Sequence, residues 1–469
     1  MSDGAPGSGG RLTLAELSDR VARGEIDTVV TVFPDLYGRL VGKRITGRFF
    51  LEQIAGHGMH ACDYLLACDV EMDPVPGYAF TSWETGYGDF LCRPDFRTLR
   101  QAAWLPRSAI VICDVLDERS EEPVSVAPRA VLARQVERAR NAGFEPRGAS
   151  ELEFFVFRES YESASAKSFT NLETFGSYVE DYHILQGTRV EPLVGEIRRV
   201  LDASAIPVEF SKGEWGPGQH EINLEYCNLL EMSDRHVLYK EAAKTVAIQQ
   251  ELAITFMAKW TAEHAGNSMH LHVSLWDADT GKKNLFEGKG DPIPGSRAEP
   301  SALFRHWLGG LIQHARATTL FFAPTVNSYK RFVAGTFAPT GIGWSYDNRT
   351  TGFRVVGRGP SLRAECRIPG GDANPYLAFA ALLAAGLDGI ERRLEPPEIF
   401  EGNLYEAEGV PQVPRTLNEA IAAAEESKML RAALGPEVLE HYLHCARTEQ
   451  RKFDETVTSW ERARYLERI

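Results

Sequence analysis

Three segments of this chain alternate ionisable residues with apolar ones, and this alternation constrains the fold more than any other feature. Successive side chains of a β-strand point to opposite faces, so each segment predicts a strand with one polar and one apolar face. The polar faces carry Glu151 and Glu153 in the first segment, His270, His272 and Ser274 in the second, and Arg363, Glu365 and Arg367 in the third.

Each segment taken alone has a simpler explanation. The glutamate and arginine strands also fit exposed edge strands with solvated charges, and a histidine on a strand is often a satisfied core residue. Two histidines at positions i and i+2 can instead ligate a metal or contact a phosphate. Two further glutamates, Glu214 and Glu221, flank a Gly-Pro-Gly bend that alone would be a surface turn.

Together the segments favour phosphoryl transfer. They supply five glutamates, two histidines and at least five arginines, with Arg349 and Arg354 a few residues before the third segment. Carboxylates hold hard divalent cations through oxygen, and cations and arginines together neutralise the charge of a phosphate in transfer. The sequence offers no serine or cysteine triad, so charge stabilisation is favoured over a covalent enzyme intermediate.

Composition narrows the class of protein. The 469 residues predict two or three domains. Lys plus Arg number 51 and Asp plus Glu number 65, and the net charge of −14 argues against nucleic-acid binding. No apolar run reaches the ~20 residues of a membrane-spanning helix, so no membrane partner is expected. Seven cysteines without a CxxC pair predict reduced thiols and a cytoplasmic location.

The chain divides into a small and a large part. Residues 1–10 are rich in glycine and serine and predict a disordered tail. Residues 11–122 predict a small sheet-rich α+β domain, and residues 123–469 a larger one in which strands alternate with helices. The expected helices span residues 13–23, 128–143, 233–253 and 375–393, a helical region spans 417–460, and loop-like insertions span 160–190 and 277–300.

The order and spacing of the polar segments resemble the type I glutamine synthetase family. The matching runs are Glu-Leu-Glu-Phe-Phe from residue 151, Gly-Gln-His-Glu-Ile from 218, Gly-Asn-Ser-Met-His-Leu-His-Val-Ser-Leu from 266, Asn-Ser-Tyr-Lys-Arg-Phe from 327, Asp-Asn-Arg-Thr from 347 and Asn-Pro-Tyr-Leu-Ala-Phe from 374. The resemblance implies an N-terminal β-grasp domain and a catalytic α/β domain with a curved antiparallel sheet. It also implies a homo-oligomer, a dodecamer of two hexameric rings, with each active site between neighbours.

The resemblance also implies a role for each polar position, with ATP as co-substrate and Mg²⁺ or Mn²⁺ at two sites. The ligands would be Glu153, Glu214 and Glu221 at the first metal site and Glu151, His270 and Glu365 at the second. Gly266 and Arg331 would hold glutamate, Arg331 by its α-carboxylate, and Arg367 would face the γ-carboxylate. Arg349 and Arg354 would stabilise the transferred phosphate, and His272, Ser274, Arg354 and Arg363 would contact ATP.

The chain departs from the family where an ammonia-using enzyme needs a carboxylate. The family carries a glutamate in a Gly-Tyr-Glu-Ala-Pro flap, and the matching run here, residues 335–339, has Phe337 at that position. The family's Asp-Gly-Ser-Ser loop is replaced by the acidic stretch 68–78. Phe337, with Trp344 nearby, predicts an apolar wall that contacts the amine substrate.

The sequence therefore predicts an ATP-dependent ligase that joins the γ-carboxylate of glutamate to an amine through γ-glutamyl phosphate. The amine would be a polyamine such as putrescine or spermidine, or a monoamine such as ethanolamine. A cationic far end would need an anionic partner, for which the candidates are Asp69, Glu71, Asp73 and Glu84. An ammonia-using glutamine synthetase and a non-enzymatic structural protein of the same fold remain as alternatives.

Overall fold

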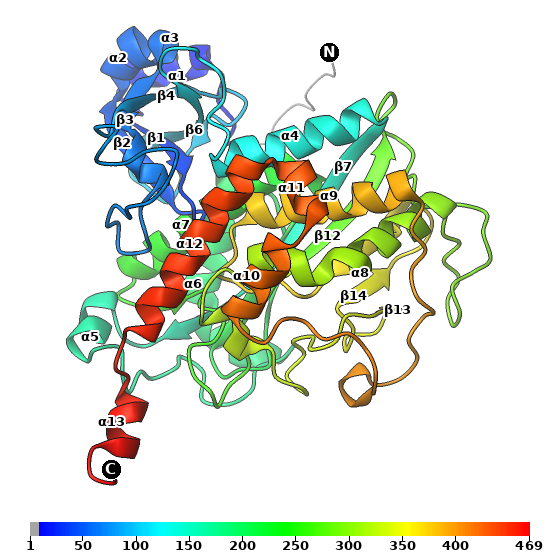
Figure 1. Cartoon of the computed structure of the whole chain (residues 1–469). Coiled ribbons are helices and arrows are strands. Elements are labelled where there is room, and N and C mark those ends of the chain that lie inside the picture. The colour runs from blue at the N-terminus through cyan, green and yellow to red at the C-terminus, as the bar shows by residue number, and fades with distance from the viewer. Residues whose placement is uncertain (1–8) are drawn as a thin grey trace.

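The computed structural model describes residues 9–469, and these form two sheets with helices around them (Figure 1). The first sheet has the order β2-β1-β6-β4-β3, with β5 paired to β6, and β1 runs parallel to β6. The elements of this N-terminal part are α1 (Leu14–Ala22), β1 (Thr28–Pro34), β2 (Leu40–Thr46), α2 (Gly47–Phe49), α3 (Ala55–His57), β3 (Met59–Cys62), β4 (Asp89–Pro94), β5 (Arg100–Gln101) and β6 (Ser108–Asp117).

Helix α1 begins where the sequence predicts it. The Thr13 hydroxyl accepts a hydrogen bond from the backbone N–H of Glu16, and the Glu16 carboxylate accepts one from the N–H of Thr13. The predicted tail, residues 1–10, lies outside the described residues except for Gly9 and Gly10.

The second sheet is larger and almost entirely antiparallel. Its order is β13-β14-β15-β12-β7-β9-β8, with β10 and β11 also paired to β7, and only β13 and β14 run parallel among the described pairs. Its strands are β7 (Phe144–Phe157), β8 (Val208–Gly213), β9 (Gln219–Leu224), β10 (Cys227–Asn228), β11 (Ala253–Thr255), β12 (Met269–Asp277), β13 (Trp344–Tyr346), β14 (Phe353–Val356) and β15 (Arg363–Cys366). The helices of this part are α4 (Pro128–Asn141), α5 (Tyr161–Ala166), α6 (Ile184–Ala203), α7 (Leu229–Gln249), α8 (Ala302–Phe322), α9 (Pro375–Arg392), α10 (Leu417–Glu425), α11 (Lys428–Leu434), α12 (Pro436–Asp454) and α13 (Ser459–Tyr465).

The central strands of this sheet separate an apolar layer from a polar one. Leu152 and Phe154 of β7 have no exposed surface. Helices α4 and α7 contact β7, and α9 contacts α4 and α7 (Figure 1). The antiparallel register places His270 of β12 opposite Glu151 of β7. The alternation in the sequence thus puts the ionisable residues together on the face away from these helices.

One helix is shifted from its expected position. The helix expected over residues 233–253 begins at Leu229, because the side chain of Asn228 accepts a hydrogen bond from the N–H of Glu231 and caps it. It ends at Gln249, since Glu251 adopts a left-handed backbone conformation (φ +55°) and the chain then enters β11.

The other expected helices are confirmed, and one expected loop is wrong. Helices α4 and α9 match residues 128–143 and 375–393, and α10 to α13 fill the region 417–460. The stretch 160–190 is predicted to be a loop but contains α5 and the start of α6. The hydroxyl of Ser160 caps α5 by accepting a hydrogen bond from the backbone N–H of Ser163. No helix within residues 9–469 is long and apolar enough to cross a lipid bilayer.

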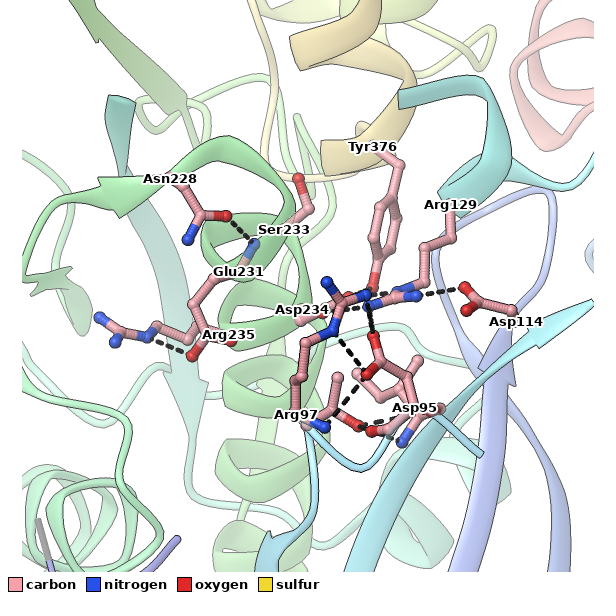
Figure 2. A network of polar contacts seen from close by, with 12 residues as sticks. Asp95, Arg97, Asp114, Arg129, Asn228, Glu231, Ser233, Asp234, Arg235 and Tyr376 are labelled. Atoms are coloured by element: carbon pink, nitrogen blue, oxygen red, sulfur yellow. Dashed lines mark hydrogen bonds and ion pairs between the residues drawn. The ribbon is translucent and has the colours of Figure 1, made fainter. Parts of the chain in front are cut away.

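A buried ion network joins the N-terminal sheet to the helices behind the large sheet (Figure 2). The guanidinium of Arg129 on α4 donates to both carboxylate oxygens of Asp234 on α7 at 3.0 Å and to Asp95, just after β4, at 2.8 Å. It also pairs with Asp114 of β6, and the Tyr376 hydroxyl on α9 donates to Asp234 at 2.7 Å. One cation therefore bridges carboxylates from both parts of the chain and fixes their relative position.

Removing this cation is expected to destabilise the fold. Arg129→Met should lower the free energy of unfolding by about 3–5 kcal/mol, because Asp234 would stay buried without its counter-ion and Asp95 would keep only Arg97. Urea denaturation measures the difference from wild type. In the matched control, Arg138→Met, an arginine of the same helix loses only its exposed partner Glu391, so less than about 1 kcal/mol should change. An equally small loss in Arg129→Met would contradict this role.

The same network gives stability a dependence on pH. Burial raises the pKa of Asp95, but Arg97 and Arg129 outweigh burial and hold it at about 2. Because the pKa is depressed in the folded state, the contribution of this carboxylate is fully present above pH ~4 and is lost as the pH falls toward 2.

Candidate active site

Two cavities open on the polar face of the large sheet and meet at Glu151, which lines both. Their volumes are about 440 Å³ and about 480 Å³. Of the residues predicted from sequence, the first cavity is lined by His272, Ser274 and Arg363. The second is lined by Glu153, Glu214, Glu221, Gly266, His270, Phe337, Arg349, Arg354 and Arg367.

Side chains from three strands form a first cluster of possible metal ligands. Nδ1 of His270 lies 3.2 Å from a carboxylate oxygen of Glu151 and 3.7 Å from one of Glu365, and suitable ligand atoms of all three lie within 4.8 Å of one another. Burial, helped by Arg367, lowers the pKa of His270 to about 4, so the imidazole is neutral at pH 7, as a metal ligand must be. Its Nε2 is buried and has no hydrogen-bond partner.

Glu153 and Glu221 form a second cluster with His270, again with ligand atoms within 4.8 Å. The two glutamates are opposite each other in the register of β7 and β9. Burial and the nearby Glu214 carboxylate raise the pKa of Glu153 to about 8, and burial with Glu151 raises the pKa of Glu221. Such crowding of buried carboxylates is relieved by a cation, and the oxygen-rich donor set fits a hard ion such as Mg²⁺ or Mn²⁺.

Glu214, the third expected ligand beside Glu153 and Glu221, lies outside both clusters. It follows β8 in the turn before β9 and lines the same cavity, but its carboxylate pairs with Nζ of Lys212. Burial lowers the pKa of Lys212, but Glu214 and Glu221 outweigh burial and raise it above its ordinary value.

Sequence reasoning missed the amide side chains that hold the glutamates in place. Nε2 of Gln219 donates to Glu153 at 3.2 Å, and Nδ2 of Asn223 donates to Glu221 at 2.9 Å. The backbone N–H of Ser268 donates to Glu153 at 2.7 Å. The signal was present in the sequence, because Gln219, Glu221 and Asn223 alternate along β9 and therefore share one face.

Two arginines hold the buried Glu365 carboxylate. Nη1 of Arg354 lies 2.9 Å from one of its oxygens, and Arg367 donates to the other. Burial raises the pKa of Glu365, but Arg367 and the histidines outweigh burial and hold it at about 2. Arg349 is exposed and lines the same cavity. The second cavity therefore combines acidic clusters with three arginines, of which Arg354 and Arg367 are held by Glu365.

Arg331 lines neither cavity. Its side chain is fully buried, and its Nη2 donates to the carbonyl oxygen of Pro369 at 2.8 Å and also to that of Ile368. It supports the chain after β15, and its Nη1 donates to the hydroxyl of Ser268, which lines the second cavity, at 3.3 Å. Its contact with the α-carboxylate of glutamate stays a prediction.

The first cavity combines flat aromatic groups with hydrogen-bonding ones. The rings of Tyr226 and Trp276 lie nearly parallel, 18° apart with centroids at 6.4 Å, and the guanidinium of Arg147 lies 4.6 Å from the Trp276 ring centroid. Such surfaces suit a planar base. Deeper in, Nε2 of His272 lies 2.7 Å from Glu151, and its Nδ1 accepts a hydrogen bond from Arg363.

Four aromatic side chains line the second cavity: Phe210, which also lines the first cavity, and Tyr182, Trp215 and Phe337, which we together call the aromatic end. The rings of Trp215 and Phe337 meet edge to face with centroids 5.5 Å apart. Phe337 has a left-handed backbone conformation (φ +60°), a strain of about 1–3 kcal/mol that is often found at functional sites. Trp344, expected in the same wall, does not line the cavity, because its indole N–H donates to the Pro397 carbonyl.

Comparisons with known proteins identify the family. The profile described as the glutamine synthetase catalytic domain matches residues 125–465. The chain belongs to the glutamine synthetase family. It is 47% identical over 458 residues to the gamma-glutamylethanolamide synthetase of Streptomyces coelicolor, covering 98% of this chain and 96% of that one. It is 33% identical over 464 residues to a glutamate–isopropylamine ligase of a Pseudomonas species, covering 97% and 98%.

A solved structure of a GmaS–ADP complex has the same fold. It matches with a TM-score of 0.82 and 30% sequence identity, covering 96% of this chain and 99% of that one. The predicted α+β class with the glutamine synthetase fold is thereby confirmed. The domain boundary near residue 122 and the individual roles of the site residues stay predictions.

Proposed function

We propose that this protein is an ATP-dependent ligase that joins the γ-carboxylate of glutamate to a primary organic amine. The class of activity, C–N bond formation from glutamate and an amine, is supported by its family and by relatives that act on ethanolamine and isopropylamine. A purely structural role is not favoured, because both clusters of possible metal ligands are intact.

The aromatic end of the second cavity is the observation that carries the choice of an organic amine. Phe337 occupies the position where the resemblance places the carboxylate of an ammonia-using enzyme, and its ring contacts Trp215. Each methylene buried against such a wall contributes about 0.8 kcal/mol, and ammonium has none to bury.

The remaining roles follow from the two cavities. His272, Ser274 and Arg363 would bind the nucleotide in the first cavity. The glutamate–histidine clusters would hold Mg²⁺ or Mn²⁺, which neutralise phosphate charge when bound. Arg349, Arg354 and Arg367 would act as fixed cations beside the transferred phosphoryl group.

Phosphorylation by ATP converts the γ-carboxylate of glutamate, a poor electrophile, into an acyl phosphate. The amine nitrogen then attacks the acyl carbon, the C–N bond forms, and the C–O bond to phosphate breaks. The amine loses a proton and inorganic phosphate leaves. Gly266, Arg331 and Arg367 would orient glutamate for both steps.

A panel of amines tests this proposal. Phosphate release is measured with ATP and glutamate against ammonium, ethanolamine, isopropylamine, propylamine and putrescine. The best organic amine should exceed ammonium in kcat/KM by at least about tenfold, as expected for two buried methylenes. Aspartate in place of glutamate should give no amine-dependent release. Highest activity with ammonium and no organic product in mass spectrometry would establish an ammonia-using enzyme instead.

We also propose that the protein works in the cytoplasm as a homo-oligomer, a dodecamer of two hexameric rings. The aromatic end supports an oligomer, because Tyr182, Trp215 and Phe337 are all exposed in the single chain and a neighbouring copy would cover them. Light scattering coupled to an activity assay checks the prediction. An active monomer at assay concentration would refute it.

A further inference from the structure

The loop of residues 256–268 brings Gly266, one of the groups proposed to orient glutamate, to the second cavity. The loop connects β11 to β12 and contains no helix or strand, although Ala265, Gly266 and Ser268 all line the cavity. Loops without regular hydrogen bonding are the mobile parts of a fold unless other contacts hold their backbone. The contacts that hold this loop therefore decide where Gly266 lies.

Gly266 packs directly against Arg331, the second group proposed to orient glutamate. A Cβ atom at residue 266 would overlap the carbonyl oxygen of Ala258 and would lie 2.5 Å from Cγ of Arg331, so only glycine fits there. Arg331 is the last residue of a short 3₁₀ helix, Ser328–Arg331. The spacing between the two groups thus depends on how the loop is joined to this 3₁₀ helix.

Two buried amide side chains tie the ends of the loop together. Nδ2 of Asn267 donates to the carbonyl oxygens of Thr255 at 3.1 Å and Met257 at 2.9 Å. Its Oδ1 accepts a hydrogen bond from Nε2 of Gln219 at 3.0 Å, and the same Nε2 donates to the Gly266 carbonyl at 3.0 Å. Both hydrogens and the oxygen of the Asn267 amide are therefore used within the loop and its support.

Asn327 joins the loop to the 3₁₀ helix that carries Arg331. Its Oδ1 accepts a hydrogen bond from the backbone N–H of Lys259 at 2.9 Å, and its Nδ2 donates to the carbonyl of Lys259 at 2.7 Å. Asn327 directly precedes the 3₁₀ helix, and Nζ of Lys259 donates to the carbonyl of His264, two residues before Gly266. A single side chain therefore links the segments that carry Gly266 and Arg331.

We propose that Asn327 is a positioning residue for the acyl donor: it fixes the spacing between Gly266 and Arg331 and thereby sets the affinity for glutamate. The inference rests on the proposed function, because it concerns the groups proposed there to orient glutamate. Asn327 lines neither cavity, so it acts through the residues that it holds. The sequence places it first in the run Asn-Ser-Tyr-Lys-Arg-Phe but assigns it no role.

Steady-state kinetics of Asn327→Ala test this proposal, with glutamate varied at saturating ATP, Mg²⁺ and an organic amine that wild type uses. The KM for glutamate should rise by about thirtyfold, as expected when two hydrogen bonds that hold the site are lost. Both kcat and the KM for ATP should stay within about threefold of wild type, because the nucleotide contacts lie in the other cavity. A role limited to stability would instead lower kcat through loss of active enzyme and leave this KM unchanged.

A second readout does not depend on turnover. Glutamate should raise the melting temperature of wild type, and the glutamate concentration that gives the same rise in Asn327→Ala should be about thirtyfold higher. Gln135→Ala is the matched control. It removes a buried amide of α4 that donates to the Ala433 carbonyl at 2.7 Å and lines neither cavity, so it should not change the KM for glutamate.

A near-isosteric variant keeps the test decisive. Asn327→Asp has the size of asparagine and retains the acceptor for the Lys259 N–H, but it cannot donate to the Lys259 carbonyl, so the KM for glutamate should rise at least about fivefold. If wild type uses glutamate and an organic amine but Asn327→Ala keeps the KM for glutamate within threefold, or raises the KM for ATP equally, the inference is wrong while the proposed function stands. If wild type does not use glutamate, both fail. Should Asn327→Ala not fold, Asn327→Asp decides the matter by the same criteria.

Discussion

His270→Ala should lower turnover by about a thousandfold or more while the protein stays folded, because metal ligation is worth several kcal/mol in such reactions. His270 belongs to both clusters of possible ligands, so its removal weakens both sites at once. Phosphate release at saturating ATP, glutamate and ethanolamine measures turnover. A second readout is independent of activity: Mn²⁺ should raise the melting temperature of wild type more than that of the variant.

A histidine elsewhere in the chain provides the control. His306 on α8 contacts the Leu394 carbonyl at 3.3 Å and lines neither cavity. His306→Ala should keep turnover within about twofold of wild type. If His270→Ala kept a tenth of wild-type turnover, or showed the wild-type response to Mn²⁺, the assignment of this residue as a ligand would be wrong.

Phe337→Glu should shift the preference from organic amine to ammonium by about a hundredfold in relative kcat/KM. Loss of the ring removes about 0.8 kcal/mol for each of two methylenes, and the new carboxylate adds a comparable attraction for ammonium. Steady-state kinetics with ethanolamine and with ammonium chloride give the two values for each variant. Phe337→Leu is the matched control, because it keeps an apolar side chain at the same strained backbone position.

The leucine variant should stay within about threefold of the wild-type preference, since most of the apolar wall remains. Equal preferences in wild type, Phe337→Leu and Phe337→Glu would show that Phe337 only packs the flap. Another carboxylate would then act as the base that deprotonates the amine.

The sequence was most informative where strand periodicity applies. Glu151, His270 and Glu365 lie far apart in the chain, yet period-two alternation and the resemblance together predicted that they share one site, and their strands are neighbours in the sheet. Gln219 and Asn223 obey the same alternation and were overlooked, because uncharged amides next to a glutamate attract less notice than histidines. The start of the helix that Asn228 caps was predicted too late in the chain for a similar reason, because Asn228 was not recognised as the cap.

The contacts between loops and the flap were beyond sequence reasoning. Nζ of Lys212 lies 4.6 Å from the ring centroid of Tyr182. This contact depends on Glu180, which joins the segment before α6 to Gly218 and His220 of the β8–β9 hairpin. No periodicity relates these residues, because tertiary contacts alone bring them together. Trp344 shows the converse error, since its closeness to Phe337 in sequence suggested a shared wall, but its indole donates to the Pro397 carbonyl instead.

The central claim is that the enzyme joins glutamate to an organic amine in preference to ammonia, and a direct competition tests it. Wild-type protein is given ATP, Mg²⁺, glutamate and equal concentrations of ethanolamine and ¹⁵N-labelled ammonium, and the γ-glutamyl products are quantified by mass spectrometry. The proposed site predicts that γ-glutamylethanolamide exceeds labelled glutamine by at least about tenfold. Labelled glutamine as the main product, with little or no γ-glutamylethanolamide, would contradict it.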